Sequence, residues 1–429
     1  MKLLIKGGRI IDPANNLNEI LDLLVVGSKI SRIGKNIQVK AAKLIDAKDK
    51  LIMPGLVDMH VHLREPGRED KETVESGTKA AAKGGVTSVL AMPNTEPAID
   101  CPKSVKLFKD IITKKAHVNV FISAAITKGR FGKELTNIAG LKKSGIVAIT
   151  DDGSSPDSRK LMSEAFKKAA QEKVLIICHC EDKNLSREGV VNKGFTSTRL
   201  GLRGISRESE YERVARDIEL AKAKKASVHI AHLSCRESVE IVAEAKRKGI
   251  KVTAETAPHY FSLSEEDLAR FDTNLKMNPP LRNKKDISVI KKGLKDGTID
   301  VIASDHAPHT ENEKDIEFER AEFGVIGLET ELAVAITNLV RTAILDWPDL
   351  VNKMAYNPAK ILKIDKGTLG LGKQADIIVV SPHQEWVVQK KEIYSKSKNS
   401  CFLGKKLTGL VEFTVCGGKI IYANVNKYK

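Results

Sequence analysis

Eight short apolar runs, separated by polar stretches with helical spacing, constrain this chain more than any other feature. The runs are 56–63, 86–94, 118–126, 145–152, 173–181, 227–234, 250–259 and 299–309. Alternation of this kind, repeated eight times, is what a (β/α)8 TIM-type barrel requires. Because the runs are nearly continuous in Val and Ile, they fit parallel strands that are buried on both faces. No Gly-rich phosphate fingerprint follows an early run, which disfavours a doubly wound sheet.

The two ends of the chain differ from this middle part. Residues 1–54 and 365–429 contain short β-like runs separated by glycine turns, and IKGGRII near the start resembles VCGGKII near the end. Such runs are typical of strands joined by tight turns. We therefore predict an α/β fold in which the barrel spans 55–364 and a small composite β domain is built from both chain ends.

Polar residues follow the predicted strands at their carboxyl ends, where barrel enzymes build their active sites. These residues are His60, His62, Asn94, Asp151, Asp152, His179, His232 and Asp305. His60 and His62 share one face of a strand, because side chains alternate with a period of two. Imidazole and carboxylate groups without a set of thiolates suit a catalytic Zn²⁺ that keeps a position open for water. The alternative is a group of unrelated polar residues, each hydrogen-bonded at its own strand end.

The composition excludes several other classes of protein. The 41% hydrophobic content excludes a disordered chain, and no run of about 18 apolar residues predicts a membrane-spanning helix. The net charge of +16 invites nucleic-acid binding, but the lysines are scattered and only 4% of residues are aromatic. The six cysteines form no disulfide or zinc-finger pattern, so we expect reduced thiols and a cytoplasmic protein that binds no nucleic acid and no membrane.

Several motifs together resemble one enzyme family. They are PGLVDMHVHLREPG (54–67), AMPNTEP (91–97), TDDGS (150–154), AHLS (231–234), ETAPHY (255–260), MNPPLR (277–282), SDHAPH (304–309) and EFGVIGLET (322–330). The chain is similar over nearly its whole length to dihydroorotases of the bacterial type I class. That family belongs to the amidohydrolase superfamily of metal-dependent barrel hydrolases, so the resemblance implies a zinc enzyme of pyrimidine biosynthesis.

The resemblance implies a role for each polar strand end. The implied zinc ligands are His60, His62, Asp152, His179, His232 and Asp305. The first two would bind one zinc, His179 and His232 a second, and the aspartate of TDDG would bridge both. The spacing from the H-x-H pair favours Asp152 over Asp151 as that bridge. Asp305 would contact the first zinc and serve as the catalytic acid and base.

The implied reaction is the reversible interconversion of dihydroorotate and N-carbamoyl-L-aspartate. The implied substrate-binding residues are His62, Arg64, Asn94, Asn278, His309, Phe323 and Gly324. Arg64 lies two residues beyond His62 and therefore on the same face if the strand persists. Its guanidinium can bind the substrate carboxylate with two parallel hydrogen bonds. The alternative for Arg64 is a surface ion pair with Glu65 or Glu69.

Two other functions remain open at this point. Hydantoinases and allantoinases bridge their metals with a carboxylated lysine on the fourth strand, and GIVAITDDG offers no lysine there. An aspartate can supply the bridge but is shorter than a carboxylated lysine, so one zinc site is the firm expectation and a second site per subunit is the weaker one. The other alternative is an inactive homologue that serves aspartate transcarbamoylase as a partner, which the intact H-x-H pair and Asp305 disfavour. A transcarbamoylase partner and a homo-oligomer are expected for an active enzyme as well.

The segment 309–324 is acidic and long for a barrel loop. Loops of this length are usually functional or mobile, so it is either a lid over the substrate or a solvated charged loop.

Overall fold

The eight apolar runs form one parallel sheet, ordered β15-β14-β13-β10-β9-β8-β7-β6 in the computed structural model, which describes residues 2–424. The strands are β6 (Leu56–Val61), β7 (Val86–Ala91), β8 (Asn119–Ala124), β9 (Ala148–Ile149), β10 (Leu175–Cys178), β13 (Val228–Ile230), β14 (Val252–Thr256) and β15 (Val301–Ile302). A parallel bridge between Val61 and His306 joins the first strand to the chain just beyond the last strand. The sheet therefore closes on itself, and the predicted barrel is confirmed.

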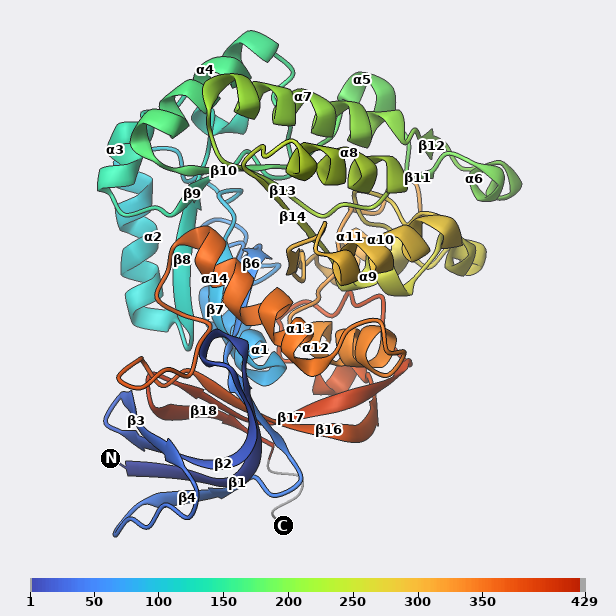
Figure 1. Cartoon of the computed structure of the whole chain (residues 1–429). Helices are drawn as coiled ribbons and strands as arrows, with labels where there is room; N and C mark the ends of the chain where they lie inside the picture. Colours follow the sequence, from blue (N-terminus) through green and yellow to red (C-terminus); the bar gives the residue numbers. More distant parts are fainter. Residues whose placement is uncertain (1, 425–429) are drawn as a thin grey trace.

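Helices cover the outside of the barrel (Figure 1). The longer ones are α1 (Val74–Gly84), α2 (Pro102–Lys115), α4 (Arg159–Glu172), α7 (Glu208–Lys224), α8 (Arg236–Arg247) and α10 (Lys284–Asp296). The shorter ones are α3 (Ile138–Lys143), α5 (Lys183–Ser186), α6 (Phe195–Leu200), α9 (Pro258–Ser262), α11 (Glu311–Lys314), α12 (Glu331–Ala335), α13 (Trp347–Val351) and α14 (Asn357–Leu362). No helix among residues 2–424 combines the length and apolar character needed to cross a membrane.

Helix α1 shows how the local sequence sets these elements. It begins at a capping box in which Thr73 and Ser76 satisfy each other's backbone N–H groups, and Gly85 ends it at φ 84°. Val74 and the alanines at positions 80–82 are buried against the barrel, whereas Lys79 on the opposite face is exposed. The helix is therefore held by its caps and by one apolar face.

A second sheet lies at one end of the molecule and combines both ends of the chain. Its strands are β1 (Lys2–Asp12), β2 (Leu17–Val26), β3 (Lys29–Gly34), β4 (Lys43–Asp46), β5 (Leu51–Pro54), β16 (Ile377–Val387), β17 (Lys406–Cys416) and β18 (Lys419–Ala423). Their order is β18-β17-β16-β5-β1-β2-β3, with β4 beside β1, so β5 and β16 join the N-terminal to the C-terminal strands. Figure 1 shows them as adjacent blue and red strands. The composite β domain of the predicted fold class is therefore present. A two-stranded parallel sheet, β11 (Val191–Asn192) with β12 (Gly204–Ile205), lies in the excursion after β10.

Candidate metal centre

The six predicted metal ligands converge at the carboxyl ends of the barrel strands, and all six side chains are buried. His60 Nε2 lies 3.2 Å from Asp152 Oδ1 and 3.5 Å from Asp305 Oδ1. His62 Nε2 lies 3.4 Å from Asp152 Oδ2 and 3.5 Å from Asp305 Oδ1. Two imidazole nitrogens and two carboxylates thus face one another across a few ångströms. We call His60, His62 and Asp305 the first half of the centre.

Both histidines of the first half are oriented by a partner on the far side of the ring. His60 Nδ1–H donates to Glu255 Oε1 at 2.6 Å, and His62 Nδ1–H donates to Asn94 Oδ1 at 2.8 Å. Because a carboxylate and an amide oxygen accept only, each ring carries a proton on Nδ1 and turns Nε2 inward. This is the arrangement in which histidine binds a metal. Burial alone would lower the pKa of His60, but Asp152 and Asp305 raise it well above its ordinary value, so a metal that binds at this Nε2 displaces a proton.

The second half of the centre consists of His179 and His232. His179 Nδ1 and His232 Nε2 are 2.7 Å apart and lie 3.8 and 3.9 Å from Asp152 Oδ1. Behind the rings the support is weaker: His179 Nε2 is 3.5 Å from Glu181 Oε2. His232 Nδ1 is buried and has no hydrogen-bond partner among the described residues. The second half is therefore assembled from the same residue types as the first but is less firmly oriented.

The donor set fits a cation. Within residues 2–424, His60 Nε2 and Asp152 Oδ1 are buried and make no hydrogen bond. Buried polar atoms are normally paired, so lone pairs left facing one another mark a place for a positive ion. Nitrogen and carboxylate donors without thiolate are the ligands of a catalytic zinc site.

The two adjacent aspartates do different work. Asp151 Oδ1 accepts from the backbone N–H groups of Ile126 and Thr127 at 2.8 and 3.0 Å, so this side chain holds the loop after β8. Asp152 faces the histidines instead. Both residues lie beyond β9, which ends at Ile149, and Asp152 already belongs to the turn that follows, so the loop rather than strand alternation directs the two side chains.

The carboxylates and histidines of the centre shift one another's pKa values. Burial alone would raise the pKa of Asp305, but the neighbouring His60 and His62 outweigh burial and hold it below its usual range. Burial and the adjacent His179 lower the pKa of His232 to about 4. Burial opposes ionisation of Glu255 too, yet His60 and His229 lower its pKa to about 2. The carboxylates are therefore anionic and His232 is neutral near pH 7, as metal binding requires.

Three residues of the site have a left-handed backbone: Arg64 at φ 60°, His232 at φ 34° and Asp305 at φ 48°. Residues with a side chain adopt such values rarely, and strained positions gather at functional sites. The condition under which Arg64 would share the face of His62 is not met, because β6 ends at Val61. The turn, rather than strand periodicity, places Arg64.

Arg64 is buried and contacts the chain beyond β15. Its Nε donates to Pro308 O at 3.1 Å, and its Nη2 lies 3.3 Å from His309 Nε2. Lys71, which the sequence did not single out, donates from Nζ to His309 Nδ1 at 3.2 Å. The guanidinium therefore lies inside the site and is not the surface ion pair considered as its alternative.

The other predicted substrate residues have contacts that connect some of them to these groups. Asn278 Nδ2 donates to Glu181 Oε2 at 3.1 Å. Gly324 has φ 126°, and a Cβ there would come 3.2 Å from His309 Nε2, so glycine leaves room at this nitrogen. Phe323 is half-buried, with Lys276 Nζ 4.5 Å from its ring centre. Asn278 therefore reaches the second half of the centre through Glu181, while Gly324 adjoins His309.

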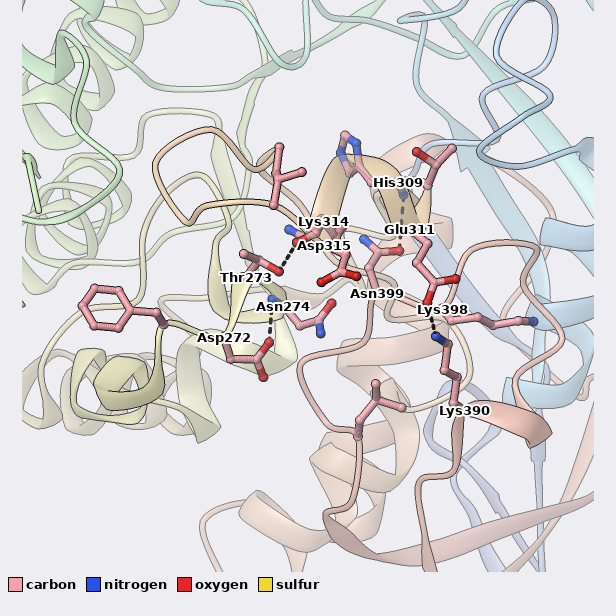
Figure 2. A pocket seen from close by; sticks show the side chains of 14 residues that line it. Asp272, Thr273, Asn274, His309, Glu311, Lys314, Asp315, Lys390, Lys398 and Asn399 are labelled. Atoms are coloured by element: carbon pink, nitrogen blue, oxygen red, sulfur yellow. Dashed lines mark hydrogen bonds and ion pairs between the residues drawn. The ribbon is translucent and has the colours of Figure 1, made fainter.

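His309 also lines a pocket of about 420 Å³. Figure 2 shows its lining, which comes from 271–274, 309–316 and 390–403, with Asn399 Oδ1 accepting from the His309 backbone N–H at 3.3 Å. The 309–324 segment is bound to the rest of the protein here, because Thr273 Oγ1 donates to Lys314 O at 2.5 Å and the buried Lys314 Nζ donates to Lys276 O at 3.4 Å. His309 thus lines this pocket and also contacts Arg64.

Sequence reasoning missed the residues that support the site. Glu255 is the first residue of the motif ETAPHY, but nothing in its position along the chain indicated a hydrogen bond with His60. Glu181 directly follows a predicted strand, which is the signal that could have selected it. His259 is buried near the centre with Nε2 unpaired among the described residues, and burial lowers its pKa to about 4.

Comparison with known proteins agrees with this description. Residues 49–238 match the family model described as dihydro-orotase-like. A dihydroorotase of Elusimicrobium minutum is 50% identical over 99% of this chain and 98% of its own length. One from Geotalea daltonii is 49% identical over 98% and 99%. Among solved structures, the L-hydantoinase of Arthrobacter aurescens has a TM-score of 0.88 at 25% identity, covering 97% of this chain and 95% of that one.

Proposed function

We propose, from the premise that this chain belongs to the dihydroorotase family, that its metal centre and Arg64 carry out the family reaction in the way described below. The protein is a hydrolase of a cyclic amide: it opens dihydroorotate to N-carbamoyl-L-aspartate and closes the ring again. The observation that carries the proposal is a buried arginine beside a cluster of histidines and aspartates.

Zinc is the metal that these donors fit. His60, His62 and Asp305 would hold the first ion, His179 and His232 the second, and Asp152 lies between the two halves within 3.9 Å of each histidine. Zinc, when bound, lowers the pKa of water to about 7 and polarises carbonyl oxygens. The residues of the chain then supply proton transfer, substrate binding and orientation.

Asp305 is the proposed acid and base. Its carboxylate is anionic and faces both histidines of the first half, so it can accept the proton of the attacking water. The same proton passes to the ring nitrogen as the C–N bond breaks. Ring closure runs these steps in reverse, because both directions share one transition state.

The substrate carboxylate would bind to three donors. Arg64 supplies a guanidinium whose Nη atoms face the site, and His309 lies against it. Asn94 uses its Oδ1 for His62, which leaves its amide N–H group for the substrate. Asn278 and the backbone around Phe323 and Gly324 would contact the ring.

A partner and an assembly also belong to the proposal. Aspartate transcarbamoylase as a partner, a homo-oligomer and a cytoplasmic location stay predictions from the sequence. The charge of +16 fits a protein that attracts anionic substrates, since basic residues around a site raise the local concentration of anions.

Substrate selectivity tests the proposal. The zinc-loaded protein is assayed with dihydroorotate and with hydantoin, which has no carboxylate. We expect kcat/KM to favour dihydroorotate by about a thousandfold, since a lost charge-assisted bidentate pair leaves buried donors unpaired. Arg64→Met should remove most of this preference. Equal turnover of both compounds by the unaltered protein would contradict the proposal.

A further inference from the structure

His309 lies between two cationic side chains that can only donate hydrogen bonds. Lys71 Nζ is 3.2 Å from Nδ1 of the ring, and Arg64 Nη2 is 3.3 Å from Nε2. A lysine ammonium and an arginine guanidinium have no acceptor, and a neutral imidazole has one N–H and one lone pair. Only one of the two contacts can therefore be a hydrogen bond while the ring is neutral.

The surroundings keep the ring neutral. Burial, followed by the charges of Arg64 and Lys71, lowers the pKa of His309. A proton on both nitrogens would place a third cation between two others, with both N–H groups facing donors. The neighbour that donates the stronger hydrogen bond to the ring then decides which of the two tautomers it adopts.

Both neighbours are held by the protein, but at different atoms. Arg64 is held through Nε, which donates to Pro308 O at 3.1 Å, whereas the atom held in Lys71 is the Nζ that contacts His309. Lys71 is therefore the neighbour whose donor is fixed. It is buried, its Nζ lies 2.9 Å from Glu313 Oε1, and its backbone carbonyl accepts from Ser397 Oγ at 2.6 Å. Glu313 Oε2 is 3.5 Å from His309 Nδ1 but already accepts from the Thr310 backbone N–H at 3.0 Å. The hydrogen bond at Nδ1 is therefore the one from Lys71, and Nδ1 accepts.

We propose that Lys71 holds His309 in the tautomer with its proton on Nε2, so that Nε2–H and Arg64 both donate to the substrate carboxylate. The inference rests on the proposed function and names a positioning residue for it, since Lys71 acts through His309. Gly324 supports it, because the absent Cβ would stand 3.2 Å from Nε2 and fill the space where an acceptor can approach.

Loss of the lysine donor would reverse the tautomer. Nδ1 would then carry the proton and donate toward Glu313 Oε2, and the Nε2 lone pair would accept from Arg64. The carboxylate would meet a lone pair instead of a donor, and one guanidinium N–H would be occupied. Binding of substrate would suffer, whereas Asp305 and the metal ligands would keep their positions.

Three variants of Lys71 and one control separate these effects. Lys71→Met removes the donor, Lys71→Gln keeps an N–H donor without charge, and Lys71→Arg keeps both. Arg68→Met is the matched control, because Arg68 Nη2 also binds Glu313 Oε1 at 2.9 Å.

The first readout is steady-state turnover of dihydroorotate by the zinc-loaded proteins. We expect Lys71→Met to raise KM about 10- to 100-fold with kcat within about threefold, because hydrogen bonds to charged groups are worth this much. Lys71→Arg or Lys71→Gln should restore most of the KM, and Arg68→Met should stay within about threefold of the unaltered protein.

The second readout is the ¹⁵N spectrum of the histidine ring in zinc-loaded protein without substrate, assigned by the signal lost in His309→Asn. We expect a protonated Nε2 and an unprotonated Nδ1, which exchange roles in Lys71→Met and persist in Arg68→Met. A protonated Nδ1 in the unaltered protein would overturn the inference whatever the reaction is. If the unaltered protein shows the expected tautomer but Lys71→Met has an unchanged KM, the tautomer has no role in substrate binding and that part of the inference is overturned. Failure of the proposed function appears separately, as absent dihydroorotate turnover in the unaltered protein.

Discussion

The two halves of the metal centre use the same kinds of side chain but are supported differently. In the first half, Glu255 and Asn94 accept from the outer nitrogens of His60 and His62 at 2.6 and 2.8 Å. In the second half, the only such contact among the described residues is His179 with Glu181 at 3.5 Å. Ring orientation by outer partners sets metal affinity. We therefore expect the first position to bind metal more tightly than the second.

The largest effect is expected at Asp305, which belongs to the first half and is the proposed acid and base. Asp305→Asn keeps the shape of the side chain but cannot accept a proton, so turnover of dihydroorotate should fall about 10³- to 10⁴-fold. Circular dichroism should show an unchanged fold. A rate within tenfold of the unaltered protein would contradict the assignment of Asp305 as acid and base.

The next largest effects are expected from two variants that each remove one histidine ligand, one from each half of the centre. His60→Asn should lower bound zinc to less than one ion per chain and remove most activity, because the first half loses a ligand. His232→Asn should leave one ion bound, because only the second half is damaged. Zinc content after dialysis, measured by atomic absorption, separates the two variants. Equal zinc loss in both variants would contradict the proposed difference between the two halves.

The supporting carboxylates should show the same difference on a smaller scale. Glu255→Gln should weaken zinc binding about 10- to 100-fold, the range found for outer partners of metal-binding histidines. Glu181→Gln should change it only a few-fold, since its contact with His179 is long. Competition with a zinc chelator measures both. A greater loss in Glu181→Gln would reverse the proposed order.

These supporting residues also mark the limit of prediction from the sequence. The barrel and the strand-end ligands could be predicted, because strand periodicity and the position of barrel active sites are local and general rules. Glu255 is 195 residues from His60, and Lys71 is 238 residues from His309. Contacts of this kind depend on how strands are placed around the barrel. The turn at Arg64 was missed because nothing in the motif shows where β6 ends.

The smallest effect concerns a buried carboxyl outside both halves. Glu331 is buried, and neither of its oxygens has a hydrogen-bond partner among residues 2–424. Burial, with a smaller contribution from Asp58, raises its pKa well above the ordinary value of 4.5. Unlike the carboxylates of the centre, Glu331 has no ion pair with a histidine in the described part of the chain, residues 2–424.

Replacement of this residue should stabilise the protein. Because the folded state holds the proton more tightly than the unfolded state, stability decreases as the pH rises from 4.5 toward the folded pKa. Glu331→Gln should gain about 1 to 3 kcal/mol at pH 8 and less at pH 5. Thermal unfolding at both values measures the difference, with exposed Glu240→Gln as the control. A gain that is equal at both pH values would show that ionisation is not the cause.

Calorimetric titration of the metal-free protein with Zn²⁺ tests the difference between the two halves most directly. The account predicts two ions per chain, bound in two steps whose affinities differ by at least about tenfold, a gap of about 1.4 kcal/mol. The weaker step should vanish in His232→Asn and the stronger in His60→Asn. Saturation at one ion, or two steps of equal affinity, would contradict the account.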